Sequence, residues 1–147
     1  MSGEPPMRAC AEALLGHLGD HGPVLVYHQT FEKTILKQLA ARFPDLAERL
    51  DAVNARVVDL LPIVKRNYYH PDMRGSWSLK AVLPTVAPDL DYASFDEVHD
   101  GAEAQSAYDE AIDPETPPER CEKIRRGLLD YCERDTLAMV RIVERFE

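Results

Sequence analysis

The sequence predicts an α/β protein that is mostly helical and has a small parallel sheet. Two short apolar runs, residues 24–27 and 56–59, are rich in valine and are bounded by turn or polar residues. Such runs are typical of strands buried on both faces. Helical periodicity fills the sequence between them, which favours parallel strands joined by a helical crossover. Because two strands are too few for a sheet covered on both faces, we expect further strands in weaker patterns or from outside this chain.

The first half of the chain is predicted to alternate helices with these strands. A helix over residues 5–18 ends at a turn containing two glycines and a proline, residues 19–23. Thr30 is the predicted N-cap of a second helix, which stops before Pro44. A third helix through residues 46–53 leads into the second strand.

The second half is predicted to be helices separated by loops. Residues 65–75 are aromatic and polar and are expected to form a loop. A short capped helix over 76–83 is expected to close at Pro84, because proline is unfavourable inside a helix. Further elements are expected in this order: a loop over 84–100, a helix over 102–111, a proline-rich linker over 113–118 and a long helix over 119–147.

The composition is that of one soluble domain with an acidic surface. The chain has 147 residues, of which 45% are hydrophobic, and its net charge is −9. That charge argues against a sequence-independent grip on phosphate backbones, which requires a basic surface, but it does not exclude carboxylates that hold cations. No stretch approaches the roughly 18 apolar residues of a membrane span, and the amino end lacks a secretory signal pattern. We expect a cytoplasmic protein with no membrane partner.

The three cysteines predict reduced thiols. Cys10, Cys121 and Cys132 are odd in number and irregularly spaced, with no Cys-x-x-Cys pair, which suits a reducing compartment. Cys132 is predicted to be a core thiol, and a zinc site is not expected. A small-molecule enzyme built on Cys132 or His70 would depend on single residues.

Asp135 is predicted to lie on the apolar face of the long final helix. At about 100° per residue it falls near the centre of that face, and Tyr131 lies one turn earlier on the same side. A lone ionised carboxylate in a core is heavily penalised unless a partner, hydrogen bonds or a metal ion compensates it. The apolar residues that share this face are Ile124, Leu128, Cys132, Met139, Ile142 and Phe146.

Three features bear on chemistry, and each has a structural alternative. Glu32 lies in the first helical turn after the first strand, at the sheet edge where ligands bind in α/β proteins, although the helix dipole alone favours a carboxylate there. Tyr131 and Asp135 can converge on one ligand, or simply hydrogen-bond to each other. The polar residues of segment 76–80 can contact a substrate, or only cap a helix whose Trp77 packs on the core.

Taken in order, these segments resemble the DEDD 3′–5′ exonucleases of the ribonuclease H-like fold. Residues 28–32 (His-Gln-Thr-Phe-Glu), followed by Leu36, are similar to their second motif, Asn-x-x-Phe-Asp-x-x-x-Leu. Residues 131–135 (Tyr-Cys-Glu-Arg-Asp) resemble the third motif, Tyr-x-x-x-Asp, of the tyrosine subclass. Residues 57–60 are similar to the superfamily's strand that ends in Asp, and residues 78–80 to its Ser-Leu-Lys helix start.

A closer resemblance is to an uncharacterised bacterial family, domain of unknown function 2779. Its Tyr-Asn-x-x-Phe-Glu element, Tyr-His-Pro loop, Gly-Ser-x-Ser-Leu-Lys element and closing Tyr-Cys-x-x-Asp-Thr helix occur here in the same order. The resemblance extends from about Pro6 over nearly the whole chain. Two residues depart from the patterns, since His28 stands where both have Asn and Glu32 where the wider superfamily has Asp.

The resemblance implies that residues 1–147 are a single exonuclease-like domain that is incomplete at its amino end. The superfamily's first motif, Asp-x-Glu on an opening strand, should precede the first helix, and the residues before that helix cannot carry it. We therefore expect the carboxyl-terminal part of a ribonuclease H-like fold, without its leading antiparallel strands.

The resemblance also implies roles for individual residues. Phosphodiester hydrolysis with two metal ions needs oxygen ligands for Mg²⁺ or Mn²⁺. By resemblance, Asp135 and Glu32 would be metal ligands, and Tyr131 would orient the attacking water. The residues expected to contact the 3′ end of a single-stranded nucleic acid are His28, Phe31, Ser78 and Lys80.

With the Asp-x-Glu ligands absent, weak metal binding or none is expected, and the chain alone is predicted to be inactive. The alternative is a non-catalytic interaction module, because an open sheet edge is a template for pairing. Such a module would form a homodimer or dock onto another polypeptide.

Overall fold

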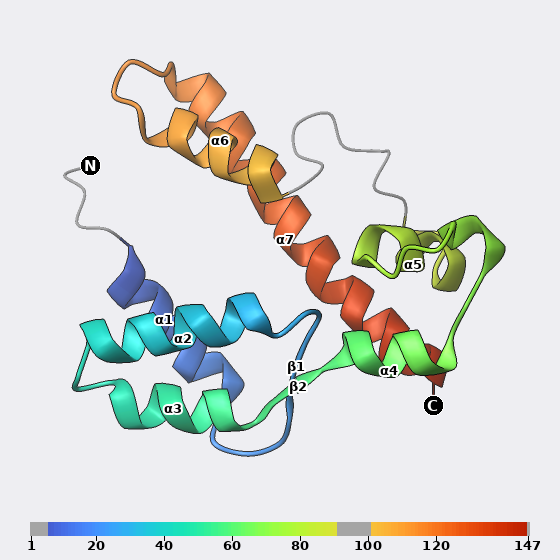
Figure 1. Cartoon of the computed structure of the whole chain (residues 1–147). Coiled ribbons are helices and arrows are strands. Elements are labelled where there is room, and N and C mark those ends of the chain that lie inside the picture. Colours follow the sequence, from blue (N-terminus) through green and yellow to red (C-terminus); the bar gives the residue numbers. More distant parts are fainter. Residues whose placement is uncertain (1–5, 91–100, 147) are drawn as a thin grey trace. The chain divides into compact units, whose positions relative to one another are not determined.

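The computed structural model describes residues 6–90 and 101–146, which form helices and a small sheet (Figure 1). The chain divides into two compact units, Met1–Tyr68 and Tyr69–Glu147. Most of the loop predicted over 84–100 lies outside the described residues. The predicted class, a mostly helical α/β protein with a small parallel sheet, is confirmed.

The described part of the first unit, residues 6–68, contains the sheet and four helices. Its strands, β1 and β2, are parallel and pair in the register Val24↔Val57, Leu25↔Val58 and Val26↔Asp59. Among the described residues the sheet has only these two strands. The elements follow in the order α1 (Met7–Leu18), β1 (Val24–Val26), α2 (Thr30–Arg42), α3 (Ala47–Ala55), β2 (Val57–Asp59) and α4 (Leu60–Asn67).

One apolar core holds the first unit together. Leu50 of α3 is fully buried, and the cluster around it draws on α1, both strands, α2 and α3. Burial of a leucine side chain contributes roughly 1.5–3 kcal/mol, so these side chains fix how the helices cover the sheet. The buried members are Ala11, Leu15, Val26, Leu36, Leu39, Ala40, Leu46, Leu50, Val53 and Val57.

Arg56 fixes the turn between α1 and β1. Its Nη1 donates to the carbonyl oxygens of His21 at 2.7 Å and Gly22 at 3.0 Å, and its Nη2 donates to that of Gly19 at 2.7 Å. The backbone N–H of Val24 donates to the Arg56 carbonyl at 3.0 Å. One guanidinium therefore satisfies the turn's carbonyls at the point where the two strands begin to pair.

The helix α4 was not predicted from the sequence. Asp59 is its N-cap, because the side chain accepts a hydrogen bond from the N–H of Leu61 at 3.0 Å. Pro62 lies in the first turn, and Lys65 and Arg66 lie in the last turn, where the helix dipole favours positive charge. The predicted loop over 65–75 is thus wrong for its first residues, which are helical.

The second unit is helical. It contains a short 3₁₀ turn, η1 (Pro71–Met73), and the helices α5 (Leu79–Val86), α6 (Gly101–Ile112) and α7 (Pro118–Phe146). Leu83 and Ala87 from the α5 region form a buried cluster with Ala138 of α7. None of the helices among the described residues is both long enough and apolar enough to cross a membrane.

Pro84 lies inside α5, so the prediction that it closes the helix is wrong. The helix continues to Val86, and the N–H of Ala87 still donates to the carbonyl of Leu83 at 2.8 Å. Proline removes one helical hydrogen bond, but the burial of Leu83 and Ala87 against α7 favours the additional turn.

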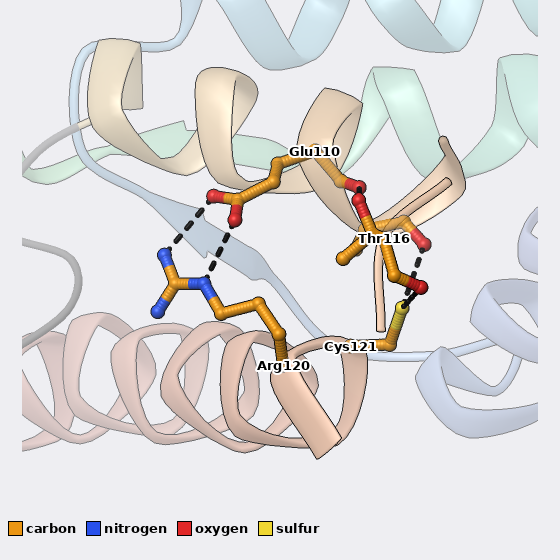
Figure 2. A network of polar contacts seen from close by, with 5 residues as sticks. Glu110, Thr116, Arg120 and Cys121 are labelled. Carbon is orange, nitrogen blue, oxygen red and sulfur yellow. Dashed lines mark hydrogen bonds and ion pairs between the residues drawn. The ribbon is translucent and has the colours of Figure 1, made fainter. Parts of the chain in front are cut away.

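A polar network joins α6 to the start of α7 (Figure 2). Arg120 donates to both carboxylate oxygens of Glu110, at 2.8 and 3.0 Å. Thr116 Oγ1 donates to the Glu110 carbonyl at 2.7 Å, and Cys121 Sγ contacts the carbonyl oxygens of Ala111 and Thr116 at 3.6 Å. The predicted proline-rich linker is therefore a tight turn held by specific contacts.

Candidate functional site

The carboxyl ends of β1 and β2 meet at Asp59. This side chain accepts three backbone hydrogen bonds: Oδ1 from the N–H of His28 at 2.9 Å and of Leu61 at 3.0 Å, and Oδ2 from the N–H of Gln29 at 3.1 Å. The carboxylate thus ties the exit of β1 to the start of α4. Both oxygens are engaged by the backbone, which makes Asp59 a structural carboxylate.

The hydrogen bonds to Asp59 affect the pKa of its carboxyl group. Burial raises the pKa of Asp59, but the backbone N–H groups of Leu61, His28 and Gln29 lower it by more, so the pKa lies below its ordinary value. Next to it, burial and the negative charge of Asp59 raise the pKa of Tyr27 to about 12. The charged carboxylate and the neutral phenol are therefore the favoured forms at this edge.

His28 adopts a left-handed backbone conformation, with φ of 71°. This conformation aims the N–H groups of His28 and Gln29 at Asp59. Asn, Asp and His tolerate this region better than most residues. The Asn in the resembling motif and the His in this chain thus meet the same backbone requirement, and the His28 side chain itself is exposed.

Glu32 and Phe31 lie in the first turn of α2, directly after this loop. Gln29 is the N-cap, with no side-chain cap bond, so the prediction that Thr30 caps the helix is wrong. Glu32 is half-buried, and its Oε2 atom is buried without a hydrogen-bond partner among the described residues. A buried acceptor left unpaired costs roughly 1–3 kcal/mol. Phe31 is 70% exposed, which leaves its ring available to a ligand.

Tyr131 and Asp135 lie on α7, in the second unit. Both are half-buried, and they follow the line of the buried residues Ile124, Ala138 and Ile142 along the helix. Asp135 therefore belongs to the packed face of α7, but it is not enclosed in a core. Glu32 belongs to the first compact unit and Asp135 to the second.

Cys132 is exposed, so the prediction of a core thiol is wrong. It is adjacent to Tyr131 and therefore turns about 100° away from the packed line of α7. Partial desolvation and the nearby negative charge of Asp135 raise the pKa of the Cys132 thiol. All three cysteines are free.

Ser78 and Lys80 lie at the start of α5. The Ser78 hydroxyl is the N-cap and accepts a hydrogen bond from the N–H of Ala81 at 3.3 Å. Ser76 supports this turn, since its Oγ accepts from the Ser78 N–H at 3.3 Å. Lys80 is exposed, and Trp77 is half-buried just before the helix.

The described residues do not by themselves make a metal centre. No three described His, Cys, Asp or Glu side chains are gathered as metal ligands, and Asp59 has both oxygens engaged by backbone N–H groups. Among the carboxylates that the structure describes, Glu32 has a buried oxygen with no hydrogen-bond partner. This donor set does not fit the two ions of the exonuclease resemblance, so no chemical step is assigned to them.

The chain belongs to a protein family that is described as "Domain of unknown function (DUF2779)". The family match covers residues 1–78, which is more than half of the chain. It therefore includes the whole first unit, the short η1 turn and the N-cap of α5. No curated protein and no solved structure matches the chain.

Proposed function

We propose that this chain is a nuclease-like domain that does not hydrolyse nucleic acid by itself. The proposal relates the chain to the metal-dependent 3′–5′ exonucleases of the ribonuclease H-like fold. Those enzymes act on the 3′ ends of single-stranded nucleic acid. The proposal rests on the order of the motifs in residues 28–36, 57–60, 78–80 and 131–135. The proposal goes beyond the family assignment, because the family description names no function.

The observation that supports the proposal best is the environment of Glu32. This carboxylate follows β1 in the first turn of α2, at the sheet edge where α/β proteins bind ligands. Its Oε2 is buried without a partner among the described residues, and a cation would compensate for that loss. In this proposal Glu32 would be a metal ligand of the first unit. By resemblance, Asp135 would be a ligand in the second unit and Tyr131 would orient water there, and a complete site would need further ligands.

A degradation assay tests the catalytic part. The chain is incubated with labelled single-stranded DNA or RNA and with Mg²⁺, Mn²⁺ or EDTA. We expect no shortening above the EDTA background, because no three of the described acidic, histidine or cysteine side chains gather as metal ligands. Robust metal-dependent degradation that Asp135→Ala abolishes would contradict the predicted inactivity.

A binding experiment tests the role of Glu32 directly. We expect Mn²⁺ to broaden the amide NMR signals around Glu32 in the wild type and to lose this effect in Glu32→Gln. Glu48→Gln is the matched control, because Glu48 lies in the first turn of α3 and is exposed. Equal broadening in all three proteins would rule out Glu32 as a ligand.

The sheet favours a second candidate, a non-catalytic module that pairs through an open strand edge. Each strand has three residues and, among the described residues, a single partner strand. Sheets of this size are not stable alone. We expect a homodimer in light scattering, with slow amide exchange in β1 or β2. A strict monomer over the whole accessible concentration range counts against self-pairing.

A further inference from the structure

The loop before α5 presents two aromatic side chains to each other. We call residues 69–78 the aromatic loop. The ring centroids of Tyr69 and Trp77 lie 6.1 Å apart, with their planes inclined at 47°. Tyr69 is 60% exposed and Trp77 is half-buried. Tyr69 keeps most of its surface in water, so its burial contributes little to folding. Core packing therefore does not account for the position of this aromatic pair.

Hydrogen bonds and one buried anchor fix the shape of the aromatic loop. The N–H of Met73 donates to the His70 carbonyl at 3.0 Å, and the N–H of Ser76 donates to the Met73 carbonyl at 2.9 Å. The Met73 side chain is 2% exposed. Arg74 and Gly75 have φ of 50° and 79°, and these two left-handed residues turn the chain back so that Trp77 returns to Tyr69. A preorganised loop loses little entropy on binding.

The aromatic loop and the start of α5 carry a small positive charge, although the chain is acidic. Residues 69–80 contain two basic residues, Arg74 and Lys80, and one acidic residue, Asp72, whereas the whole chain has 17 basic and 26 acidic residues. Both basic side chains are exposed, which suits contacts with a polyanion.

We propose that the aromatic loop binds unpaired bases of single-stranded nucleic acid. Bases stack on Tyr69 and Trp77, and the neighbouring basic side chains meet the phosphates. Such stacking tolerates any sequence, because every base has a π-face. The inference rests on the proposed nucleic-acid function and adds a substrate contact to it. Aromatic grooves also bind proline-rich peptides, but the positive charges of Arg74 and Lys80 favour a polyanion.

Trp77 reports on this binding directly, because it is the only tryptophan in the chain. The chain is titrated with oligothymidylate at low salt in EDTA, which excludes hydrolysis. We expect saturable quenching of Trp77 fluorescence. If the oligonucleotide does not quench Trp77 fluorescence at low salt, the inference is overturned. It is also overturned if a proline-rich peptide quenches the fluorescence and the oligonucleotide does not.

Variants locate the contact. By anisotropy of a labelled oligonucleotide, we expect Tyr69→Ala to weaken binding about 5- to 150-fold, while Tyr69→Phe keeps the ring and the affinity. Tyr108→Ala is the matched control, because Tyr108 is an exposed tyrosine on α6, 39% accessible. Equal weakening by Tyr69→Ala and Tyr108→Ala overturns the inference.

Salt dependence tests the phosphate contacts. We expect Arg74→Ala to reduce the slope of log affinity against log salt by about one, and Arg125→Ala, an exposed arginine on α7, to leave it unchanged. If Arg74→Ala and Arg125→Ala change the salt slope equally, the phosphate contact at Arg74 is overturned. Because the titrations contain EDTA, they separate the two proposals. Absent oligonucleotide binding together with intact Mn²⁺ broadening at Glu32 would count against base stacking but not against the nuclease-like assignment.

Discussion

The two compact units hold their helices in different ways. In the first unit, α3 buries Leu50 and Val53 in a core that also draws on α1, α2 and both strands. In the second unit, α6 buries no side chain, and its half-buried positions include the alanines 104, 107 and 111. Alanine buries little apolar area. The polar network of Figure 2 therefore carries more of the attachment of α6 to α7.

This contrast shows where each unit gets its specificity. Apolar burial between distant elements defines the first unit, and one carboxylate, Asp59, sets the geometry at the sheet edge. In the second unit, Glu110 and Arg120 are only ten residues apart in the sequence. Its contacts at this turn are therefore local. Substitutions in the core of the first unit should therefore cost more stability than substitutions at this turn.

Leu50→Ala should destabilise the protein most. Leu50 is fully buried, and truncation of a buried leucine typically costs about 2–5 kcal/mol of unfolding free energy. Its counterpart is Ile112→Ala in α6, where the side chain is 60% exposed and the expected cost is below about 0.5 kcal/mol. Denaturant unfolding followed by circular dichroism measures both. Equal losses would mean that apolar burial holds α6 as well.

Asp59→Asn should have the next largest effect. The amide keeps one oxygen for His28 and Leu61 but points an NH₂ group at the N–H of Gln29, which donates to Oδ2 in the wild type. A lost acceptor at a partly buried site costs about 1–3 kcal/mol. Asp51→Asn, on the exposed side of α3, is the control and should leave the urea midpoint unchanged.

The pH dependence follows from the lowered pKa of Asp59. Its contribution to stability is fully present above the unfolded-state pKa of about 3.9. It is lost as the pH falls through the lower pKa of the folded state. The stability gap between wild type and Asp59→Asn should therefore stay constant from pH 7 down to about pH 5 and narrow as the pH falls below about 4. A gap in urea unfolding that keeps its size below about pH 4 would show that the charge of Asp59 is not involved.

Arg120→Ala should have the smallest effect. The side chains of Arg120 and Glu110 are 39% and 43% exposed, and pairs of this kind contribute up to about 1 kcal/mol. We expect faster amide hydrogen exchange in α6 with little change in global stability. Arg125→Ala is the control, because its contact with Glu122 is 3.9 Å long and more exposed. A large global loss would contradict a local role for the network.

Most elements could be predicted because their signals are local. The apolar spacing and the bounding turn residues identified β1, β2 and the helices other than α4, with ends within a few residues. The helix α4 was missed because residues 57–64 are almost continuously apolar, and periodicity alone cannot divide such a run into strand and helix. Asp59 as a cap followed by Pro62 was the local signal of the boundary.

The site was predictable only in part. The sequence identified Glu32, Tyr131 and Asp135 as candidates, and their catalytic roles remain predictions. Asp59 was noted only as the end of a strand, because nothing in its neighbours reveals hydrogen bonds from His28 and Gln29, about 30 residues away.

The sequence alone determined the fold class, the family and the order of the elements other than α4 and η1, because hydrophobic periodicity and turn residues act over a few neighbours. Tertiary structure decided what depends on distant partners. It carried α5 through Pro84, left Cys132 exposed, and brought Tyr69 to Trp77 across a folded loop. The physical reason is that burial and hydrogen bonding depend on which side chains meet in space.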